Sequence, residues 1–116
     1  MKKIKIMPEY FCSPIWIAKD GVSFENINID DINLITDNLK EIILKWDMTY
    51  QNTFNQEYPP DSMFKNSEEE LEFERKGIQI LKQLHYEIEK IYKISYFSVK
   101  KNKLISFEDI LGDNLY

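Results

Sequence analysis

The segment that most constrains the fold is residues 67–91, where apolar residues recur every three or four positions. This period lays one apolar stripe along a helix of about seven turns, and the stripe must pack against other elements. Ser67 followed by Glu70 is typical of a capping box, so the helix is predicted to begin at Ser67. The stripe consists of Leu71, Ile78, Leu81, Leu84, Ile88 and Ile91.

A glycine interrupts this helix at Gly77, where it costs about 1 kcal/mol relative to alanine. We expect another element to approach closely there, and the second helix is the predicted neighbour. That second helix is predicted over residues 37–54, with Thr36 as its N-cap. Two adjacent prolines make residues 55–66 a loop. The second stripe consists of Leu39, Ile42, Ile43, Trp46 and Tyr50.

Strands are predicted on both sides of the helical region. Residues 2–7 alternate polar and apolar side chains, which is typical of a strand with one buried face. Residues 15–17 are β-prone, and Asp20-Gly21 predicts a turn into a return strand at residues 22–24. Residues 25–35 are expected to form a loop.

A second hairpin is predicted near the C-terminus, from β-prone runs at residues 93–99 and 104–107. The order β-ββ-α-α-ββ defines an α+β fold: a mixed or antiparallel sheet of about four to five strands, with two helices packed on one face. Residues 1–116 are expected to form a single domain, with a loosely ordered tail at 108–116 that has a helix-like turn at most.

The composition narrows the class of function. A net charge of -5 argues against direct nucleic-acid binding and favours a basic partner. No apolar run approaches the ~20 residues that span a bilayer, and the N-terminus becomes polar too early for a signal peptide. The only cysteine, Cys12, cannot form an internal disulfide. We therefore expect a cytoplasmic protein that does not bind membranes.

Catalytic, metal-binding and cofactor-binding motifs are missing from the sequence. One cysteine and one histidine cannot supply the usual zinc ligand sets, and three glycines leave little room for a phosphate-binding loop. His85 lies beside the apolar stripe and is interpreted as a border residue of the helix. Cys12 lies in a turn between two prolines and is interpreted as a buried small side chain. No catalytic residue, metal or cofactor is predicted.

Acidic residues are dense at the start of the 67–91 helix and in the loop before it. They are interpreted either as a helix cap with a solvated face or as a negative surface for a cationic partner. Aromatic residues in the same loop are interpreted either as interface anchors or as lids on the core. The predicted partner-binding residues are Glu57, Tyr58, Asp61, Phe64, Glu68, Glu69 and Glu72, with Tyr10 from the N-terminal turn.

A motif near the N-terminus carries a family resemblance. Residues 7–16 read M-P-E-Y-F-C-S-P-I-W, which matches the pattern M-P-x-Y-x-C-x-P-[IL]-W. The pattern resembles the start of a family of small bacterial proteins similar to immunity proteins of polymorphic or contact-dependent toxin systems. The resemblance continues at Trp46 and Tyr50 and around Gly77, and it covers about residues 4–97. In its structural interpretation, Cys12 and Trp16 fill the core beneath the helices.

The resemblance implies a non-enzymatic protein that binds and neutralises a cognate toxin domain by covering its active site. The acidic charge is suited to a basic nuclease as that toxin. Two other hypotheses remain at this stage. One is a small enzyme that uses Cys12 or His85, and the other is a housekeeping adaptor or oligomer subunit that pairs through a sheet edge.

Overall fold

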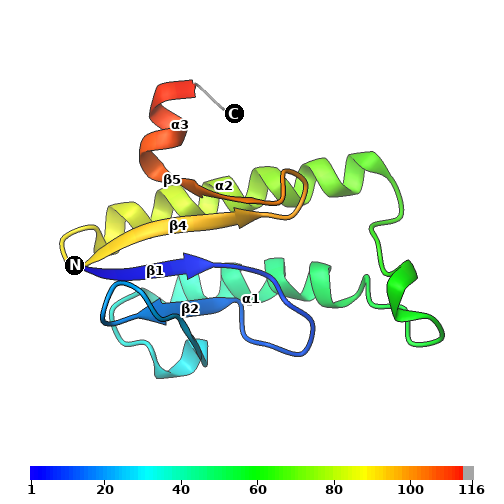
Figure 1. Ribbon diagram of the computed structural model, residues 1–116, viewed down its shortest axis with the longest axis horizontal. Coiled ribbons are helices and arrows are strands. Elements are labelled where there is room, and N and C mark those ends of the chain that lie inside the picture. The colour runs from blue at the N-terminus through cyan, green and yellow to red at the C-terminus, as the bar shows by residue number, and fades with distance from the viewer. Residues whose placement is uncertain (114–116) are drawn as a thin grey trace.

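The computed structural model describes residues 1–113, and the side chains of residues 1–110. It contains a five-stranded mixed sheet in the order β3-β2-β1-β4-β5 (Figure 1). The predicted α+β class and the helices on one face are confirmed. The elements are β1 (Lys2–Ile6), β2 (Ile15–Ala18), β3 (Glu25–Ile27), α1 (Asp37–Gln51), α2 (Ser67–Ile88), β4 (Tyr92–Ser98), β5 (Lys103–Ser106) and α3 (Phe107–Asp113), with 3-10 turns η1 (Ile29–Asp31) and η2 (Pro59–Asp61).

The strand β1 lies at the centre of the sheet. It pairs antiparallel with β2 and parallel with β4, which puts Ile4 beside both Ile17 and Ile94. Ile6 is likewise flanked by Ile15 and Tyr96. All of these side chains share one face because alternate residues of a strand point the same way. The alternation predicted for residues 2–7 is therefore confirmed, and it defines the buried face.

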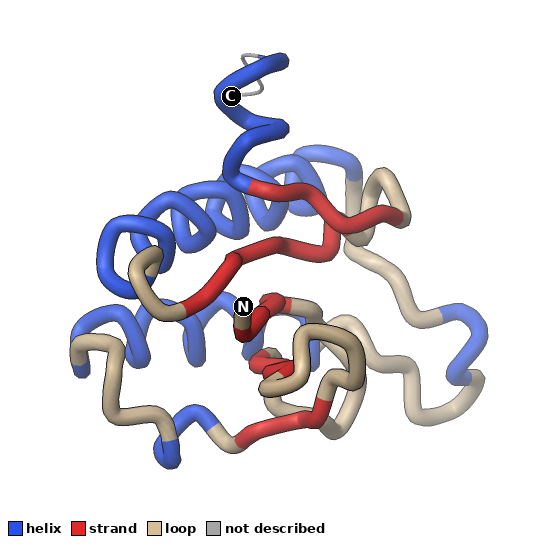
Figure 2. Tube along the Cα trace, turned by 60° about the vertical axis from the view of Figure 1, so that its left-hand side comes forward, coloured by secondary structure: helices blue, strands red, loops and turns tan. Residues whose placement is uncertain are grey.

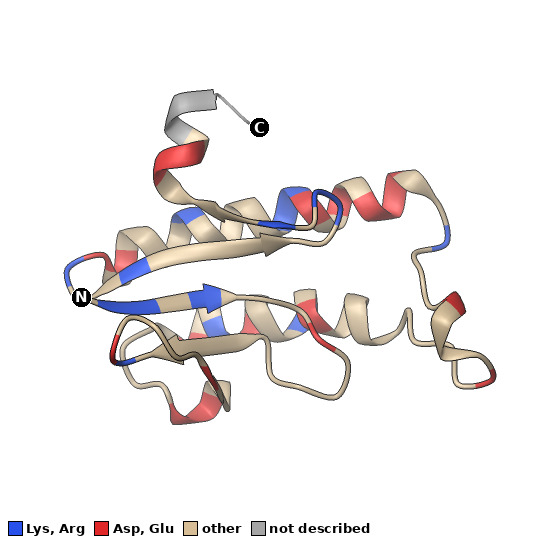
Figure 3. Ribbon diagram, viewed as in Figure 1, with Lys and Arg blue, Asp and Glu red and all other residues tan. Residues whose placement is uncertain are grey.

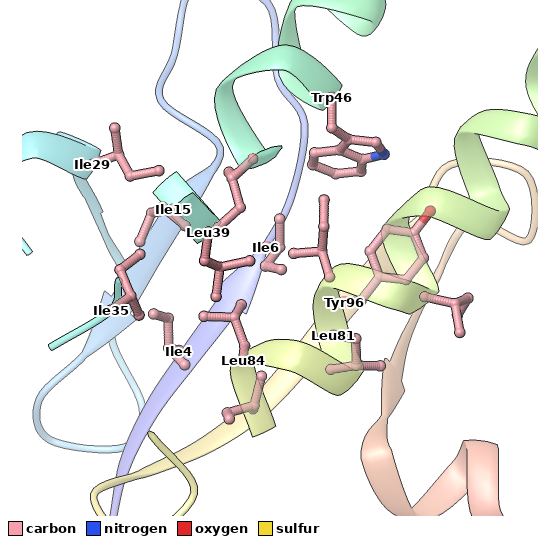
Figure 4. Close-up of a cluster of buried hydrophobic side chains, with 14 of the residues drawn as sticks. Ile4, Ile6, Ile15, Ile29, Ile35, Leu39, Trp46, Leu81, Leu84 and Tyr96 are labelled. Atoms are coloured by element: carbon pink, nitrogen blue, oxygen red, sulfur yellow. The ribbon is translucent and has the colours of Figure 1, made fainter. Parts of the chain in front are cut away.

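The long helices α1 and α2 cover this face, and Figures 1 and 2 show both of them on the same side of the sheet. Leu39, Ile43 and Trp46 of α1 are buried, as are Leu81 and Leu84 of α2. Figure 4 shows Leu39, Trp46, Leu81 and Leu84 together with the strand isoleucines between the layers, and Ile43 belongs to the same cluster. At about 25 cal/mol per Å² of apolar area, this cluster is the main favourable term in folding.

Hydrogen bonds join the two helices at separate points. Thr36 donates its backbone N–H to Glu87 Oε1 at 2.9 Å, and its hydroxyl to Oε2 of the same carboxylate at 3.1 Å. Further along, Trp46 donates its indole N–H to the carbonyl of Phe73 at 3.0 Å, and the two rings stack. The predicted N-cap at Thr36 is also confirmed, since its hydroxyl accepts from the amide of Leu39.

The return strand of the first hairpin begins later than predicted. The carboxylate of Asp20 accepts the backbone N–H groups of Val22 and Ser23, each at 2.8 Å, and this holds residues 22–24 in a turn. These two amides also lower the pKa of Asp20. Pairing with β2 starts at Glu25, so the prediction of a loop over residues 25–35 was wrong for β3 and η1.

Two local predictions about α2 need correction. The N-cap is Asn66, not Ser67: the Asn66 side chain accepts from the amide of Glu69 at 2.8 Å, and Ser67 is the first helical residue. Gly77 does make a close approach, but its neighbour is strand β4. A Cβ on Gly77 would lie 2.6 Å from the ring of Tyr96, so the helix sits directly on that ring.

The helix ends also differ from the predictions. The helix α1 ends at Gln51, since the amides of Thr53 and Phe54 bond three residues back in tighter turns. The helix α2 ends at Ile88, which leaves Ile91 exposed. At the C-terminus the chain forms α3, more than the single turn expected, while residues 114–116 of the predicted tail lie outside the described residues. The described helices include none that is long and apolar enough to cross a membrane.

Candidate functional site

The acidic residues predicted to bind a partner gather at one end of the molecule. The 55–66 loop and the first turns of α2 lie together at the right of Figure 3, and both carry carboxylates. We call this surface the acidic end and define it as Glu57, Asp61, Glu68, Glu69 and Glu72. The tertiary structure thus brings the loop acids and the helix acids to the same side.

Side-chain hydrogen bonds order the loop of the acidic end. The side-chain oxygen of Asn55 accepts the backbone N–H groups of Glu57 and Tyr58 at 3.0 Å each. The backbone N–H of Asn55 donates to the hydroxyl of Ser62 at 2.8 Å. Such side-chain to backbone bonds fix a turn without regular structure. The loop therefore presents Glu57 and Asp61 from an ordered frame.

A hollow of about 290 Å³ lies beside the acidic end. It is formed where α1 ends and α2 begins, and Glu69 and Lys65 contribute opposite charges to its wall. Met63 also lines it and is 70% exposed. Unbranched methionine side chains adapt to irregular partners, so this recess can accept a side chain of another protein.

The aromatic residues of the candidate set divide into two kinds. Tyr58 is 57% exposed and projects from the loop, as an interface anchor does. Phe64 is buried and packs against Phe73 with ring centroids 5.1 Å apart, so it is a lid on the core. Tyr10 is half-buried, stacks on Tyr50 at 4.6 Å and shares a hydrogen bond of 2.6 Å with Thr53.

The acidic residues differ in their surroundings as well. Glu57, Asp61 and Glu68 are exposed, whereas Glu69 is half-buried. Glu72 is exposed and lies 3.7 Å from Arg75, in a pair between two side chains that are each more than half exposed. Such a pair contributes little to stability, so its carboxylate can exchange Arg75 for a partner's cation.

The N-terminal motif folds into a turn that docks on the end of α1. The side chain of Gln51 holds it from both sides. Its Oε1 accepts the backbone N–H of Phe11 at 3.1 Å, and its Nε2 donates to the backbone carbonyl of Glu9 at 2.9 Å. The motif segment and residues 46–53 carry the family resemblance separately in the sequence, and in the fold they are in contact. This contact gives most of the motif a structural role.

The predicted positions of Cys12 and Trp16 were wrong. Cys12 is half-buried in the turn and does not fill the core. Trp16 lies on the opposite face of the sheet from Ile15 and Ile17, because neighbouring residues of a strand alternate. Its indole N–H donates to the carbonyl of Met7 at 3.0 Å.

The structure separates the two residues considered for catalysis. His85 stacks on Phe107 at 3.7 Å and its Nε2 lies 2.6 Å from Glu89, in a hollow that Met1 also lines. Cys12 lies beyond the far end of β1, which spans about 13 Å at ~3.3 Å per residue. The two side chains therefore form no dyad. Within the part of the chain that the structure describes, no group of acids, cysteines or histidines could hold a metal ion.

Two ionisable groups beneath the motif turn are perturbed. Burial raises the pKa of Asp47, and a hydrogen bond from Gln51 at 3.3 Å opposes this only in part. Burial raises the pKa of Tyr50, and the neighbouring Tyr10 and Glu9 raise it further. Both shifts favour neutral side chains, which is the expected result of packing acids under a turn.

A buried carboxylate that sequence reasoning missed is Glu74. It belongs to the acidic run of α2, yet it is completely buried and accepts from Tyr96 at 2.9 Å, Ser98 at 2.7 Å and the amide of Lys100 at 3.3 Å. The one signal in the sequence is its position four residues before Ile78, which puts it on the same side of the helix as the apolar stripe.

The described part of the candidate site consists of surface charges, an exposed aromatic ring and a recess, which is the kind of site that protein interfaces use. The chain belongs to the family described as Serratia CdiI immunity protein-like, which matches residues 2–99. A search of curated proteins found no match. Family membership supports a toxin-neutralising immunity protein with a cognate toxin as its partner, and a role in binding rather than catalysis.

Proposed function

We propose that this protein neutralises a toxin domain that is a basic nuclease, by covering the active site of the nuclease with the acidic end. The observation that carries the proposal is the gathering of five carboxylates and the exposed ring of Tyr58 on one end of the molecule. Family membership supports the toxin as the partner. The nuclease and the mode of inhibition are inferred from charge.

Charge complementarity supports a nuclease as the toxin. A nuclease binds the phosphate backbone through clustered lysines and arginines, and an acidic surface competes for those same groups. The net charge of -5 adds long-range attraction, which raises the rate of encounter. We place the encounter in the cytoplasm, where the lone Cys12 stays reduced.

Co-expression tests this proposal. The toxin domain encoded beside this chain is expressed with and without it, and growth, co-purification and nuclease activity on plasmid DNA and total RNA are measured. We expect the chain to restore growth, to co-purify with the toxin and to abolish nucleic-acid cleavage. A toxin that is neutralised but cleaves no nucleic acid would contradict the nuclease, and a toxin that is not neutralised would contradict the function.

A further inference from the structure

The face of the sheet that points away from α1 and α2 is covered by no helix in the described structure, although Phe24 of the turn after β2 lies against Lys5 and Ala18 of β2 is buried. Figure 1 looks onto this face, and α3 extends beyond the β5 edge instead of crossing it. The ring of Phe107 stacks on His85 of α2, which draws α3 toward the helical side. We call the outward-pointing surface the open face. Its residues are Lys3, Lys5, Trp16, Lys93, Ser95, Phe97 and Leu104.

The open face is positively charged although the protein is acidic. The parallel register places Lys3 directly beside Lys93, and Lys5 lies between Trp16 and Ser95. No acidic residue occupies an outward position on the five described strands, as Figure 3 shows for β1 and β4. Like charges on adjacent strands repel each other, so the fold itself gains nothing from this arrangement.

These lysines have no anionic partner among the described residues. The ion pairs found there involve Lys45, Arg75 and His85, all on the helices. Glu89 and Glu108 line a hollow that Lys93 also lines, but neither forms an ion pair with it. Lys3 and Lys93 are exposed and therefore available to an external anion, whereas Lys5 is half-buried and contributes its charge from beneath.

Aromatic rings hold the central lysine in place. The Lys5 ammonium lies 4.4 Å from the ring centroid of Phe24 and 5.7 Å from that of Trp16. Cation–π contacts of this kind fix the charge and occupy a face of each ring. Bases of a nucleic acid would need free ring faces for stacking, so this arrangement favours a carboxylate ligand over a nucleotide.

An apolar patch continues the open face toward β5. Phe97 and Leu104 lie side by side in the β4–β5 register, and Leu104 is 46% exposed. Lys93 and Phe97 are four residues apart on β4, a separation of about 13 Å at ~3.3 Å per residue. A ligand for the whole face therefore needs carboxylates at one end and an apolar side chain about 13 Å away.

We propose that the open face docks an acidic segment of the cognate toxin. Carboxylates of that segment pair with Lys3, Lys5 and Lys93, and an apolar side chain covers Phe97 and Leu104. The identity of the partner rests on the proposed function, but the surface is distinct from the acidic end. One toxin domain thus presents cations to one surface of this protein and carboxylates to another.

The test uses the double variant Lys3→Glu with Lys93→Glu and the matched control Lys76→Glu with Lys82→Glu. The control lysines are exposed on α2, on the other side of the sheet, and both variants change the net charge equally. Affinity for the toxin domain encoded beside this chain is measured by calorimetry. We expect the sheet variant to bind at least about tenfold more weakly and the control variant to bind as tightly as the unmodified chain.

A single variant, Lys3→Glu, adds a readout of folding. It replaces the Lys3–Lys93 repulsion with an attractive cross-strand pair, so Tm should rise by about 2 °C while toxin affinity falls. A purely structural role for Lys3 would move stability and affinity together. A rise in Tm together with a fall in toxin affinity is therefore specific to docking. It also shows that the weaker binding does not come from misfolding.

The remaining outcomes are also decisive. Unchanged toxin affinity in the double variant overturns the inference and leaves the proposed function standing, whereas no binding by the unmodified chain overturns both. Binding of a labelled single-stranded RNA, about 20 nucleotides long, that the double variant loses would make nucleic acid the occupant and overturn the inference. A dimer in sedimentation that the double variant converts to a monomer would make a second copy the occupant, with the same consequence.

Discussion

The acidic end and the open face differ in what their charges do for the fold. At the acidic end, Glu68 and Glu69 lie in the first turn of α2, where the helix dipole favours negative charge by about 0.3–1 kcal/mol each. On the open face, Lys3 and Lys93 lie side by side without a counterion among the described residues. The helix acids have a structural explanation, while the Lys3–Lys93 pair is repulsive.

This difference shows that the number of charges is a weaker guide to function than the unfavourable free energy that the charges add to folding. The acids are numerous and evident from the sequence, yet a helix N-terminus alone accounts for several of them. The lysines are few, but no described carboxylate offsets the repulsion between Lys3 and Lys93. Substitutions in each region distinguish charges that stabilise the fold from charges that bind a partner.

The largest effect is expected for Glu74→Ala. Glu74 ties the acidic half of α2 to β4, and its removal takes this acceptor from the hydroxyls of Tyr96 and Ser98. We expect the free energy of unfolding to fall by about 3 kcal/mol, measured by denaturant titration. Glu74→Gln is the control, since it keeps one acceptor oxygen and should lose less. Equal losses in both variants would contradict a role for the hydrogen bonds.

The next effect is expected for the triple variant Asp61→Lys, Glu68→Lys and Glu69→Lys. It reverses the charge of the acidic end, so toxin affinity should fall by about 10- to 100-fold and depend less on salt. Calorimetry at two salt concentrations measures both quantities.

The matched control for the acidic end reverses Glu25, Asp30 and Asp31, which are exposed in and just after β3. It makes the same change in net charge at a different place, so it should keep most of the affinity. Equal losses in the two triple variants would show that net charge, and not the acidic end, attracts the toxin.

A smaller effect is expected for Tyr58→Ala. Its ring is 57% exposed, so truncation should leave Tm nearly unchanged and weaken toxin binding by up to about tenfold. Phe64→Ala is the informative contrast, because removal of a buried ring should lower stability by about 3 kcal/mol. Thermal melts and calorimetry on both variants distinguish an anchor from a lid. Full affinity in the Tyr58 variant would remove this ring from the interface.

The smallest effect is expected for Asp47→Asn, which lies under the motif turn and outside both regions. Burial raises the pKa of Asp47, so its ionisation opposes folding. This penalty is absent below the ordinary pKa of an aspartate and complete above the raised one. The amide should therefore stabilise the protein more at about pH 7 than at about pH 3, as measured by denaturation at each pH. A gain of the same size at both pH values would contradict the shift.

The sequence predicted the fold well because its signals were local. The alternation of residues 2–7 identified the central strand, and the three-and-four spacing identified both helices. Gly77 correctly predicted a close approach, but the neighbour is Tyr96 of β4 rather than the other helix. A glycine within a helix indicates that another element packs closely there, but it does not indicate which element that is.

The candidate site was less predictable, because the surroundings of its side chains depend on residues that are distant in the sequence. Phe64 and Tyr58 belong to one loop, yet one lies in the core and the other in solvent. Glu74 belongs to an acidic run, but its hydrogen-bond partners come from a strand more than twenty residues away. Burial depends on long-range neighbours, which a single sequence does not identify.

The sequence by itself determined the helices, most of the strands and the excess of negative charge, because these depend on short-range periodicity and composition. The tertiary structure decided which charges meet. It set Lys3 beside Lys93 through a parallel pairing between β1 and β4, whereas the acids of the loop and of α2 are already neighbours in the sequence. That pairing joins strands from opposite ends of the chain, so only the packed sheet could create the open face.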